Sequence, residues 1–529
     1  MRDRSAGGTR PPAHPPLLLA CLIAGLMATA TPAPAIAQPG TANRPDTAYQ
    51  IAVEIRSSVG RDIRAFYRDR GYRPLWIKDE TIGPEADRLI EYLETADLDG
   101  LDPADYDSGA LGRAVDKARG GSPEALAKAE IKLSRAFAAY VHDVRRPPAV
   151  KIVYLDKELE PQPPAPLAVL RTAAVSGSFS DYLDRGGWNH PFYAQLRDAL
   201  AEQRTRWGNL PNVQIPAGPM LRPGAKGARV RLIRQRLGLP EGGAFDKLLA
   251  AEVKAFQAAH GLKADGIAGA GTIAALNRGS AYYEQAIRLN LERTRLLPPL
   301  SQGRFIVVDA ASARLWLYEH GALEDTMKVI VGKPTEQTPM LAGMMRYAVV
   351  NPYWNVPPDL VRRRIVPKVV DEGASLGALG YEALSDWTHD ARVLNQSEID
   401  WSAVAAGREE LRVRQLPGKT NAMGKMKFMF PNDLGIYLHD TPDKALFRDD
   451  KRRFSSGCVR LEDAPRLAKW LFGKPLEVPT DAPEQQVYLD QPVPVYITYL
   501  TAAPTDTGIA FREDDYGRDA AVPERLARR

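Results

Sequence analysis

The chain has 529 residues and a formal net charge of +5, with 44% hydrophobic and 26% charged residues, which is ordinary for globular proteins. So small a charge gives no electrostatic reason to expect nucleic-acid binding, and the composition identifies no other partner. The length exceeds what one hydrophobic core normally organises, so two to four domains are expected.

The N-terminus, residues 1–37, has the pattern of a secretory signal peptide. Arginines precede the apolar run LLLACLIAGLMATA, and the small residues of APAIAQ predict cleavage after Ala37. The run is shorter than the roughly 20 residues that a membrane helix needs. We therefore expect an exported, soluble protein.

Residues 47–217 are predicted to form a helical scaffold domain. Apolar residues recur at helical spacing in segments 86–93 and 133–141, and Pro84 can begin the first of these helices. No chemistry is predicted from this region.

Residues 221–278 predict a small module of three helices. A Gly-Leu pair followed by a glycine occurs at 238–243 and again at 261–266, each time after an apolar helical stripe, where glycine permits a tight turn. With Phe256-Gln257 and Thr272, the segment resembles the peptidoglycan-binding domain type 1 family. The alternative is that these residues only cap and pack a helical bundle.

Residues 304–520 are predicted to form a mainly β domain, because the apolar period changes to two. The expected strands are RFIVVDA, ARLWLYE, KVIVG, RYAVVNPYWNV, KFMF and GIYLHD. The later segments VPVYITYL and GIAFRED flank the turn-rich TAAPTDT and predict a hairpin. The fold class is therefore multidomain α+β.

Residues 357–417 form a long insertion in this β domain. Their prolines and glycines predict short helices joined by flexible turns rather than another sheet layer, and long insertions of this kind are often functional lids. An insertion that merely packs on the flank of the domain is the alternative.

Cys458 would be the only thiol left after cleavage, because Cys21 lies in the signal peptide. An odd cysteine in an exported protein indicates intermolecular pairing or a reactive thiol. His439 lies 19 residues earlier, at the end of the predicted strand GIYLH, and can take the thiol proton. Zinc normally needs three or four closely spaced protein ligands, which this region lacks, so we predict a nucleophile and not a metal site.

The residues around Cys458 complete the predicted site. Gly457 would let the backbone turn so that its amide and that of Cys458 converge on an oxyanion. Arg460 is predicted to hold a substrate carboxylate. The basic run 451–453 is the less favoured candidate for this role, because charge runs are usually solvated surface. Ser455 and Ser456 either bind substrate or only cap the loop.

The segments YLHDTPDKALFRDDKRRFSSGCVRLED, VGKPTEQTPM, NPYWNVPPDL and KFMFPN resemble the L,D-transpeptidase catalytic domain of the YkuD type. The order of scaffold, peptidoglycan-binding module and catalytic domain resembles the large YcbB-like branch of that family. His439 and the run Ser455–Arg460 match the family's pattern of histidine, spacer and Ser/Thr-x-Gly-Cys. Ser456 stands where many members have a second histidine, so His439 is the one histidine candidate for the base.

The resemblance implies an enzyme that crosslinks peptidoglycan in the periplasm without a metal or organic cofactor. Cys458 would attack the carbonyl of the third residue of a tetrapeptide stem, usually meso-diaminopimelate, and expel D-alanine. An amine of a second stem would then resolve the thioester to give a 3-3 crosslink, with His439 as proton acceptor and donor. Tyr437 and Trp354 resemble substrate-pocket residues of the family, with core packing as the alternative.

Two alternatives remain at this stage. The thioester could instead be resolved by water, by a free D-amino acid or by an amine of an outer-membrane protein, because pocket shape selects the acceptor. A non-catalytic wall-binding scaffold is the other reading. The sequence does not specify an oligomeric state.

Overall fold

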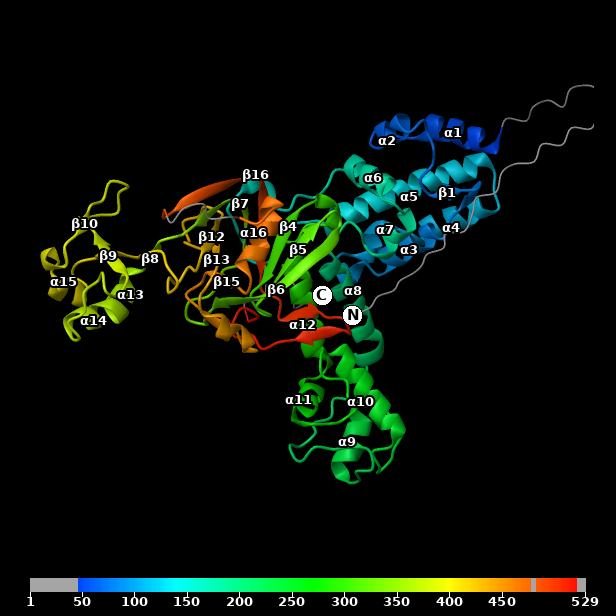
Figure 1. Cartoon of the computed structure of the whole chain (residues 1–529). Coiled ribbons are helices and arrows are strands. Elements are labelled where there is room, and N and C mark those ends of the chain that lie inside the picture. Colours follow the sequence, from blue (N-terminus) through cyan, green and yellow to red (C-terminus); the bar gives the residue numbers. More distant parts are fainter. Residues whose placement is uncertain (1–45, 477–481, 521–529) are drawn as a thin grey trace, which may run out of the picture. The chain divides into compact units, whose positions relative to one another are not determined.

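The computed structural model describes residues 46–476 and 482–520 (Figure 1). The predicted signal peptide, residues 1–37, lies outside this range. None of the helices within the described ranges combines the length and apolarity that a bilayer span requires.

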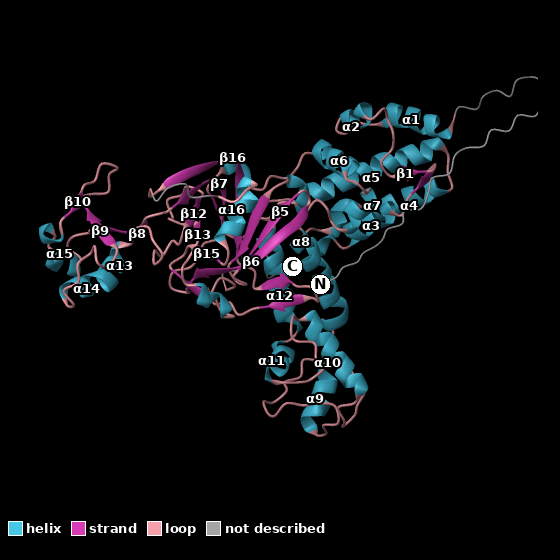
Figure 2. Cartoon of the chain, viewed as in Figure 1, coloured by secondary structure: helices cyan, strands magenta, loops and turns pink. Residues whose placement is uncertain are grey.

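The predicted scaffold is helical, and Figure 2 shows helices as its main elements. The helix α5 contacts α1, α3, α4 and α6, and its buried face includes Leu133, Phe137 and Val141, as the helical spacing predicted. The scaffold elements are α1 (Thr47–Ser58), α2 (Arg64–Asp69), β1 (Ile77–Lys78), β2 (Thr81–Ile82), α3 (Glu85–Glu94), η1 (Ala96–Asp99), η2 (Pro103–Tyr106), α4 (Ser108–Arg119), α5 (Pro123–Val144), β3 (Val153–Tyr154), η3 (Lys157–Leu159), α6 (Pro166–Val175), α7 (Phe179–Asp184), α8 (Pro191–Glu202) and η4 (Gln203–Trp207).

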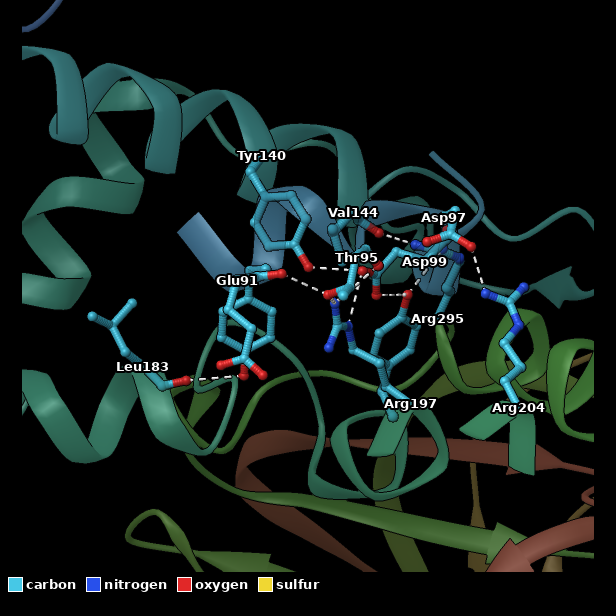
Figure 3. Close-up of polar contacts among 12 residues, drawn as sticks. Glu91, Thr95, Asp97, Asp99, Tyr140, Val144, Leu183, Arg197, Arg204 and Arg295 are labelled. Atoms are coloured by element: carbon cyan, nitrogen blue, oxygen red, sulfur yellow. Dashed lines mark hydrogen bonds and ion pairs between the residues drawn. The ribbon is translucent and has the colours of Figure 1, made fainter. Parts of the chain in front are cut away.

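A buried polar network joins this scaffold to the segment that leads into the β domain (Figure 3). The Asp99 carboxylate accepts hydrogen bonds from Tyr140, Tyr193 and the Nε of Arg197, at 2.7 to 3.0 Å. The Nη2 of Arg295 donates to the Asp99 carbonyl oxygen at 2.7 Å. Because a buried charge needs partners, this network fixes the position of the segment that contains Arg295.

The three-helix module is present as predicted. It comprises α9 (Ala228–Arg236), α10 (Lys247–Ala259) and α11 (Ala270–Arg278), and α12 (Ser280–Thr294) and η5 (Leu300–Gln302) follow it. Its core includes Val230, Leu249 and Phe256. Gly261 has φ of +65°, and a Cβ there would lie 2.4 Å from the Cα of Ala510, so a glycine is required at this turn.

The β domain is built on a closed ring of paired strands. Pairing runs in the order β12, β13, β15, β6, β5, β4, β16 and β7, and β12 also pairs with β7, which closes the ring around an apolar core. The elements are β4 (Phe305–Asp309), β5 (Arg314–Glu319), β6 (Ala322–Gly332), β7 (Leu341–Val350), β12 (Met426–Met429), β13 (Leu438–His439), η8 (Lys444–Arg448), β14 (Arg453–Ser455), β15 (Val459–Leu461), α16 (Ala464–Phe472), β16 (Gln485–Thr498), β17 (Ala502–Pro504) and β18 (Ile509–Phe511).

Two details of this domain differ from the sequence-based expectation. The predicted scaffold supplies a strand to the β domain, because β3 pairs in parallel with β7 through Val153↔Leu341. The predicted late hairpin forms between β17 and β18, whereas the segment VPVYITYL belongs to β16 and pairs with β4 and β7. Both differences arise because backbone pairing between distant segments leaves no signal in local periodicity.

The insertion has a small core of its own, with Val356, Leu360, Ala383 and Val413 among its buried residues. The prediction that it lacks a sheet layer is wrong: four strands pair in the order β10, β9, β11 and β8. Segment 412–415 alternates half-buried and buried residues, a β pattern that the prolines and glycines of the insertion obscured. The elements of the insertion, together with the strand β8 that immediately precedes it, are β8 (Trp354–Val356), α13 (Pro358–Leu360), η6 (Val361–Ile365), α14 (Val366–Val370), β9 (Tyr381–Leu384), β10 (Val393–Leu394), η7 (Gln396–Glu398), α15 (Trp401–Ala405) and β11 (Arg412–Gln415).

Candidate active site

Strand register brings Cys458 and His439 to one face of the sheet. The short strands β13 and β15 are parallel, with Leu438 opposite Val459 and His439 opposite Arg460. Leu438 and Val459 are fully buried in the core of the β domain. Because side chains alternate along a strand, His439 and Arg460 lie on the opposite face, and Cys458, two residues before Arg460, shares it.

The Cys458 thiol is free and half-buried. Its Sγ donates a hydrogen bond to the carbonyl oxygen of Gly435 at 3.3 Å. Burial raises the pKa of Cys458 to about 11, although the Tyr437 backbone N–H, the Tyr437 hydroxyl and the charge of Arg460 stabilise the thiolate. The resting group is therefore a thiol at neutral pH, and reaction requires that a base take its proton.

His439 is neutral and held by one ring nitrogen. Its Nδ1 lies 2.6 Å from the carbonyl oxygen of Asp440, and since a carbonyl can only accept, Nδ1 carries the proton and Nε2 is left as an acceptor. Burial and the nearby charge of Arg460 lower the pKa of His439 to about 3. Within the described residues no hydrogen bond joins His439 to the Cys458 thiol, so the resting pair is not preassembled.

The turn that presents Cys458 is closed by Ser455, a buried residue. The Ser455 Oγ donates to the Cys458 carbonyl oxygen at 2.6 Å and accepts from the Gly457 N–H at 3.2 Å. Gly457 has φ of +112°, in the region that favours glycine. Ser455 therefore caps the loop, and the prediction that it binds substrate is not supported.

The same hydrogen bond revises the predicted oxyanion site. Since the Gly457 N–H is already bonded to Ser455, it does not point to an empty position. The Cys458 N–H has no hydrogen-bond partner among the described residues and remains the candidate donor. Gly457 contributes its backbone conformation and not its amide.

Sequence reasoning missed Thr338, which holds this turn from a distant segment. Its hydroxyl donates to the Gly457 carbonyl oxygen at 2.7 Å and accepts from the Gly332 N–H at 2.9 Å. Thr338 is fully buried and lies in the quoted segment VGKPTEQTPM. Its only signal in the sequence was membership of that segment, because hydrogen bonding over 119 residues leaves no local pattern.

Arg460 forms no ion pair within the described residues, although the charge of Asp443 acts on it. Its Nε is buried and has no hydrogen-bond partner within the described part of the chain. Desolvation lowers the pKa of Arg460, and the charges of Asp443, Cys458 and Arg364 also act on it. Arg364 belongs to η6 of the insertion, so the insertion brings a second positive charge toward Arg460.

The remaining predicted site residues divide into two groups. Tyr437 is near the thiol, to which its hydroxyl hydrogen-bonds, and its ring centroid lies 5.7 Å from that of His439. Ser456 donates a hydrogen bond to the carboxylate of Glu336, which together with Lys333 lowers the pKa of Glu336. Trp354 instead packs against the core of the insertion, so the core-packing alternative holds for this residue.

No group of three or more His, Cys, Asp or Glu side chains in residues 46–476 and 482–520 is placed to hold a metal ion. Cys458, His439 and Arg460 are suited instead to covalent catalysis: a nucleophile, a neutral base and a cation for a carboxylate.

Comparison with protein-family models finds three domains in this chain. Residues 303–495 match the L,D-transpeptidase catalytic domain of the YkuD family, residues 61–200 match a scaffold domain, and residues 227–276 match the family described as "Putative peptidoglycan binding domain". The chain therefore carries an L,D-transpeptidase catalytic domain together with a scaffold domain and a peptidoglycan-binding domain.

A curated relative from Haemophilus influenzae, named "Putative L,D-transpeptidase", is 31% identical over 245 residues. The match covers 45% of this chain and 49% of the relative, so it spans about half the length of each protein.

Solved structures of L,D-transpeptidases are also similar, at low identity. One from Mycobacterium smegmatis is 14% identical over 37% of this chain and 58% of its own, with a TM-score of 0.19. One from Xylanimonas cellulosilytica is 15% identical over 53% of this chain and 98% of its own, with a TM-score of 0.17. TM-scores this low carry no structural argument.

Proposed function

We propose that this protein is a periplasmic L,D-transpeptidase that joins peptidoglycan stem peptides by 3-3 crosslinks through a Cys458 thioester. The observation that carries the proposal is the register of β13 and β15, which puts His439, Cys458 and Arg460 on one face within a domain that matches the L,D-transpeptidase family. The match of residues 227–276 to a peptidoglycan-binding family supports the same substrate.

In the first step, the Cys458 sulfur attacks the carbonyl carbon of the third stem residue. The thiol proton passes toward Nε2 of His439 as the C–S bond forms, because neither the free thiolate nor the free imidazolium is stable in the resting site. The Cys458 N–H stabilises the oxyanion, and Arg460 binds a carboxylate of the stem. Collapse of the intermediate expels D-alanine, whose amine takes the proton from His439.

In the second step, the side-chain amine of another stem attacks the thioester, and His439 accepts its proton. Cys458 leaves as the thiolate and takes the proton back from His439, so each turnover exchanges one amide bond for another. We propose that the insertion acts as a lid that covers the active site during this step. The charge of Arg364, in η6 of the insertion, acts on Arg460 and supports this role. A lid that excludes water would favour attack by the amine.

The periplasmic location is supported by the signal-peptide pattern of residues 1–37, followed by a domain that matches a wall-binding family. No partner protein is needed for the reaction as proposed. An amine of an outer-membrane protein is an acceptor that the same acyl-enzyme could use.

The decisive experiment incubates the purified protein with a disaccharide tetrapeptide and analyses the products by mass spectrometry. We expect a dimer mass that corresponds to loss of one D-alanine, and fragmentation that places the new bond between two third residues. Cys458→Ala should give no dimer, whereas the matched variant Ser456→Ala should retain it. Dimer formation by Cys458→Ala would refute the proposal. A tripeptide product without dimer would mean that water, and not an amine, resolves the thioester.

A further inference from the structure

A cavity of about 380 Å³ is lined by residues that lie between Val141 and Tyr496 in the chain, and none of the lining residues belongs to the candidate active site. Its wall includes Arg145 at the end of α5, Tyr182 of α7, Trp188, and Tyr496 of β16. A volume of this size falls within the roughly 300–1,000 Å³ typical of small-molecule sites.

Arg145 forms no ion pair within the described residues. Its side chain makes one hydrogen bond there, from Nη1 to the Leu297 carbonyl oxygen at 3.3 Å. Burial lowers the pKa of Arg145 to about 10, which leaves it charged at neutral pH. Arg145 is half-buried, and an anion bound in the cavity would stabilise its charge.

The neighbouring Arg295 shows how this protein satisfies a buried arginine. Arg295 donates to the carbonyl oxygens of Asp99 and Val144 (Figure 3), and also to the Glu292 carboxylate and the Tyr193 hydroxyl. The positive charge of Arg295 also acts on Arg145 and destabilises its protonated form. Arg145, by contrast, has the Leu297 carbonyl oxygen as the one hydrogen-bond acceptor of its side chain within the described residues.

Two phenol groups accompany Arg145. The hydroxyls of Tyr182 and Tyr496 have no hydrogen-bond partner in the described part of the chain, and the charge of Arg145 acts on both. Tyr182 lies against Gly187, where a Cβ would come within 2.3 Å of its ring, so the glycine admits the ring to this position. One guanidinium and two hydroxyl donors are suited to a carboxylate.

Trp188 contributes an apolar part of the cavity wall. Its side chain is 4% exposed, and its Nε1–H is buried without a hydrogen-bond partner within the described residues.

Carboxylates of the protein lie on the same wall but at its exposed edge. Glu158 and Glu160 are both exposed, form no ion pair within the described residues, and do not figure among the charges that act on Arg145. The cavity thus has a cation inside and acids at its rim. A simple anion would be repelled by the rim, whereas a zwitterion complements both ends.

We propose that this cavity binds an amino acid or short peptide as a zwitterion. Its carboxylate would contact Arg145 and the hydroxyls of Tyr182 and Tyr496, and its ammonium group would face Glu158 and Glu160. The inference does not depend on the proposed transpeptidase activity, because it involves binding alone.

The test measures binding of alanylalanine by calorimetry to the full chain carrying Cys458→Ala, so that no acyl transfer can occur. Binding should weaken at least tenfold in Arg145→Met and severalfold in Tyr182→Phe or Tyr496→Phe. Acetate, which lacks the ammonium group, and alanylalanine amide, which lacks the carboxylate, should each bind at least tenfold more weakly than alanylalanine.

Two controls separate this cavity from other sites and from misfolding. The Tyr154 hydroxyl is also buried without a hydrogen-bond partner within the described residues, but Tyr154 does not line the cavity. Tyr154→Phe should therefore leave the binding of alanylalanine unchanged. Arg363→Met, at an exposed arginine that is paired with Asp359, should likewise leave binding unchanged. The proposal is overturned if Arg460→Met abolishes binding and Arg145→Met does not, if the tyrosine variants bind as the parent does, or if acetate or phosphate binds as tightly as the dipeptide.

Discussion

The hydroxyl of Thr338 donates a hydrogen bond of 2.7 Å to the carbonyl oxygen of Gly457, the residue that precedes the candidate nucleophile. The Thr338 hydroxyl oxygen also accepts a hydrogen bond from the Gly332 N–H, so one buried side chain ties the nucleophile turn to the end of β6. Thr338 is a positioning residue, because it acts on Cys458 only through the turn.

Thr338→Val should therefore impair the reaction without removing any reacting group. The Gly457 carbonyl and the Gly332 N–H would both lose a partner, at a cost of about 1–3 kcal/mol in the free energy of unfolding. We expect kcat for crosslinking to fall at least tenfold while KM changes little, and Thr338→Ser to restore most of the rate. Equal activity in the valine and serine variants would exclude the positioning role.

The resting thiol should be unusually unreactive. Because the pKa of Cys458 is raised to about 11, its alkylation by iodoacetamide should accelerate about tenfold for each pH unit between 7 and 10, with no plateau in that range. Tyr437→Phe removes a hydrogen bond to the thiolate and should slow alkylation at every pH. Intact-mass measurements of the alkylated protein would follow both rates, and a plateau below pH 9 would contradict the stated environment.

Arg460 should govern substrate binding more than chemistry. Arg460→Gln removes the cation that is proposed to meet a stem carboxylate, and the loss of one charged hydrogen bond of about 1.5–3 kcal/mol predicts a KM that is roughly 10- to 150-fold higher. Arg364→Gln should raise KM severalfold through the weaker, longer-range interaction. Arg363→Gln is the matched control, because Arg363 is exposed and already paired with Asp359. Kinetics in which only kcat changes would assign Arg460 a different role.

Three buried histidines should make the folded state sensitive to mild acid. Burial lowers the pKa of His190 to about 3, of His260 to about 4 and of His439 to about 3. The unfolded chain then binds more protons below its ordinary histidine pKa of about 6.5, so stability is complete above that pH and declines as pH falls toward the folded values. Each histidine should cost about 2 kcal/mol between pH 6.5 and 5.

His190→Asn tests this sign, because asparagine can keep the N-terminal cap of α8 that the His190 Nδ1 now provides. The difference in unfolding free energy between pH 7 and pH 5 should become smaller by about 2 kcal/mol, the contribution expected of one histidine. His389→Asn, at a fully exposed position, should leave that difference unchanged. Urea unfolding at the two pH values provides the measurement.

We expect the three-helix module to bind peptidoglycan through its positive charge. Residues 221–278 contain ten Lys and Arg against four Asp and Glu, and Arg222, Lys226 and Arg231 are exposed. Replacing these three by glutamine in the full Cys458→Ala chain should reduce sedimentation with isolated sacculi severalfold, most at low salt. Unchanged sedimentation would mean that charge on this surface does not hold the wall.

Local sequence patterns determined much of this protein. Helical spacing located α3 and α5, the glycine repeat located the three-helix module, and period-two segments located most strands of the β domain. The run Ser455–Arg460, with His439 upstream, identified the candidate nucleophile and base. These features are local, so composition and spacing over a few residues are sufficient to reveal them.

Tertiary structure decided which polar groups meet. It assigned the Gly457 N–H to Ser455, took Trp354 into the core of the insertion, gave that insertion its sheet, and brought Thr338 to the nucleophile turn. Within residues 46–476 and 482–520, it also left Arg145 and Arg460 without an ion pair while pairing Arg295 with Glu292. Each of these outcomes depends on hydrogen bonds and burial between segments far apart in the chain, and such contacts are selected by the packing of the whole fold rather than by the period of any one segment.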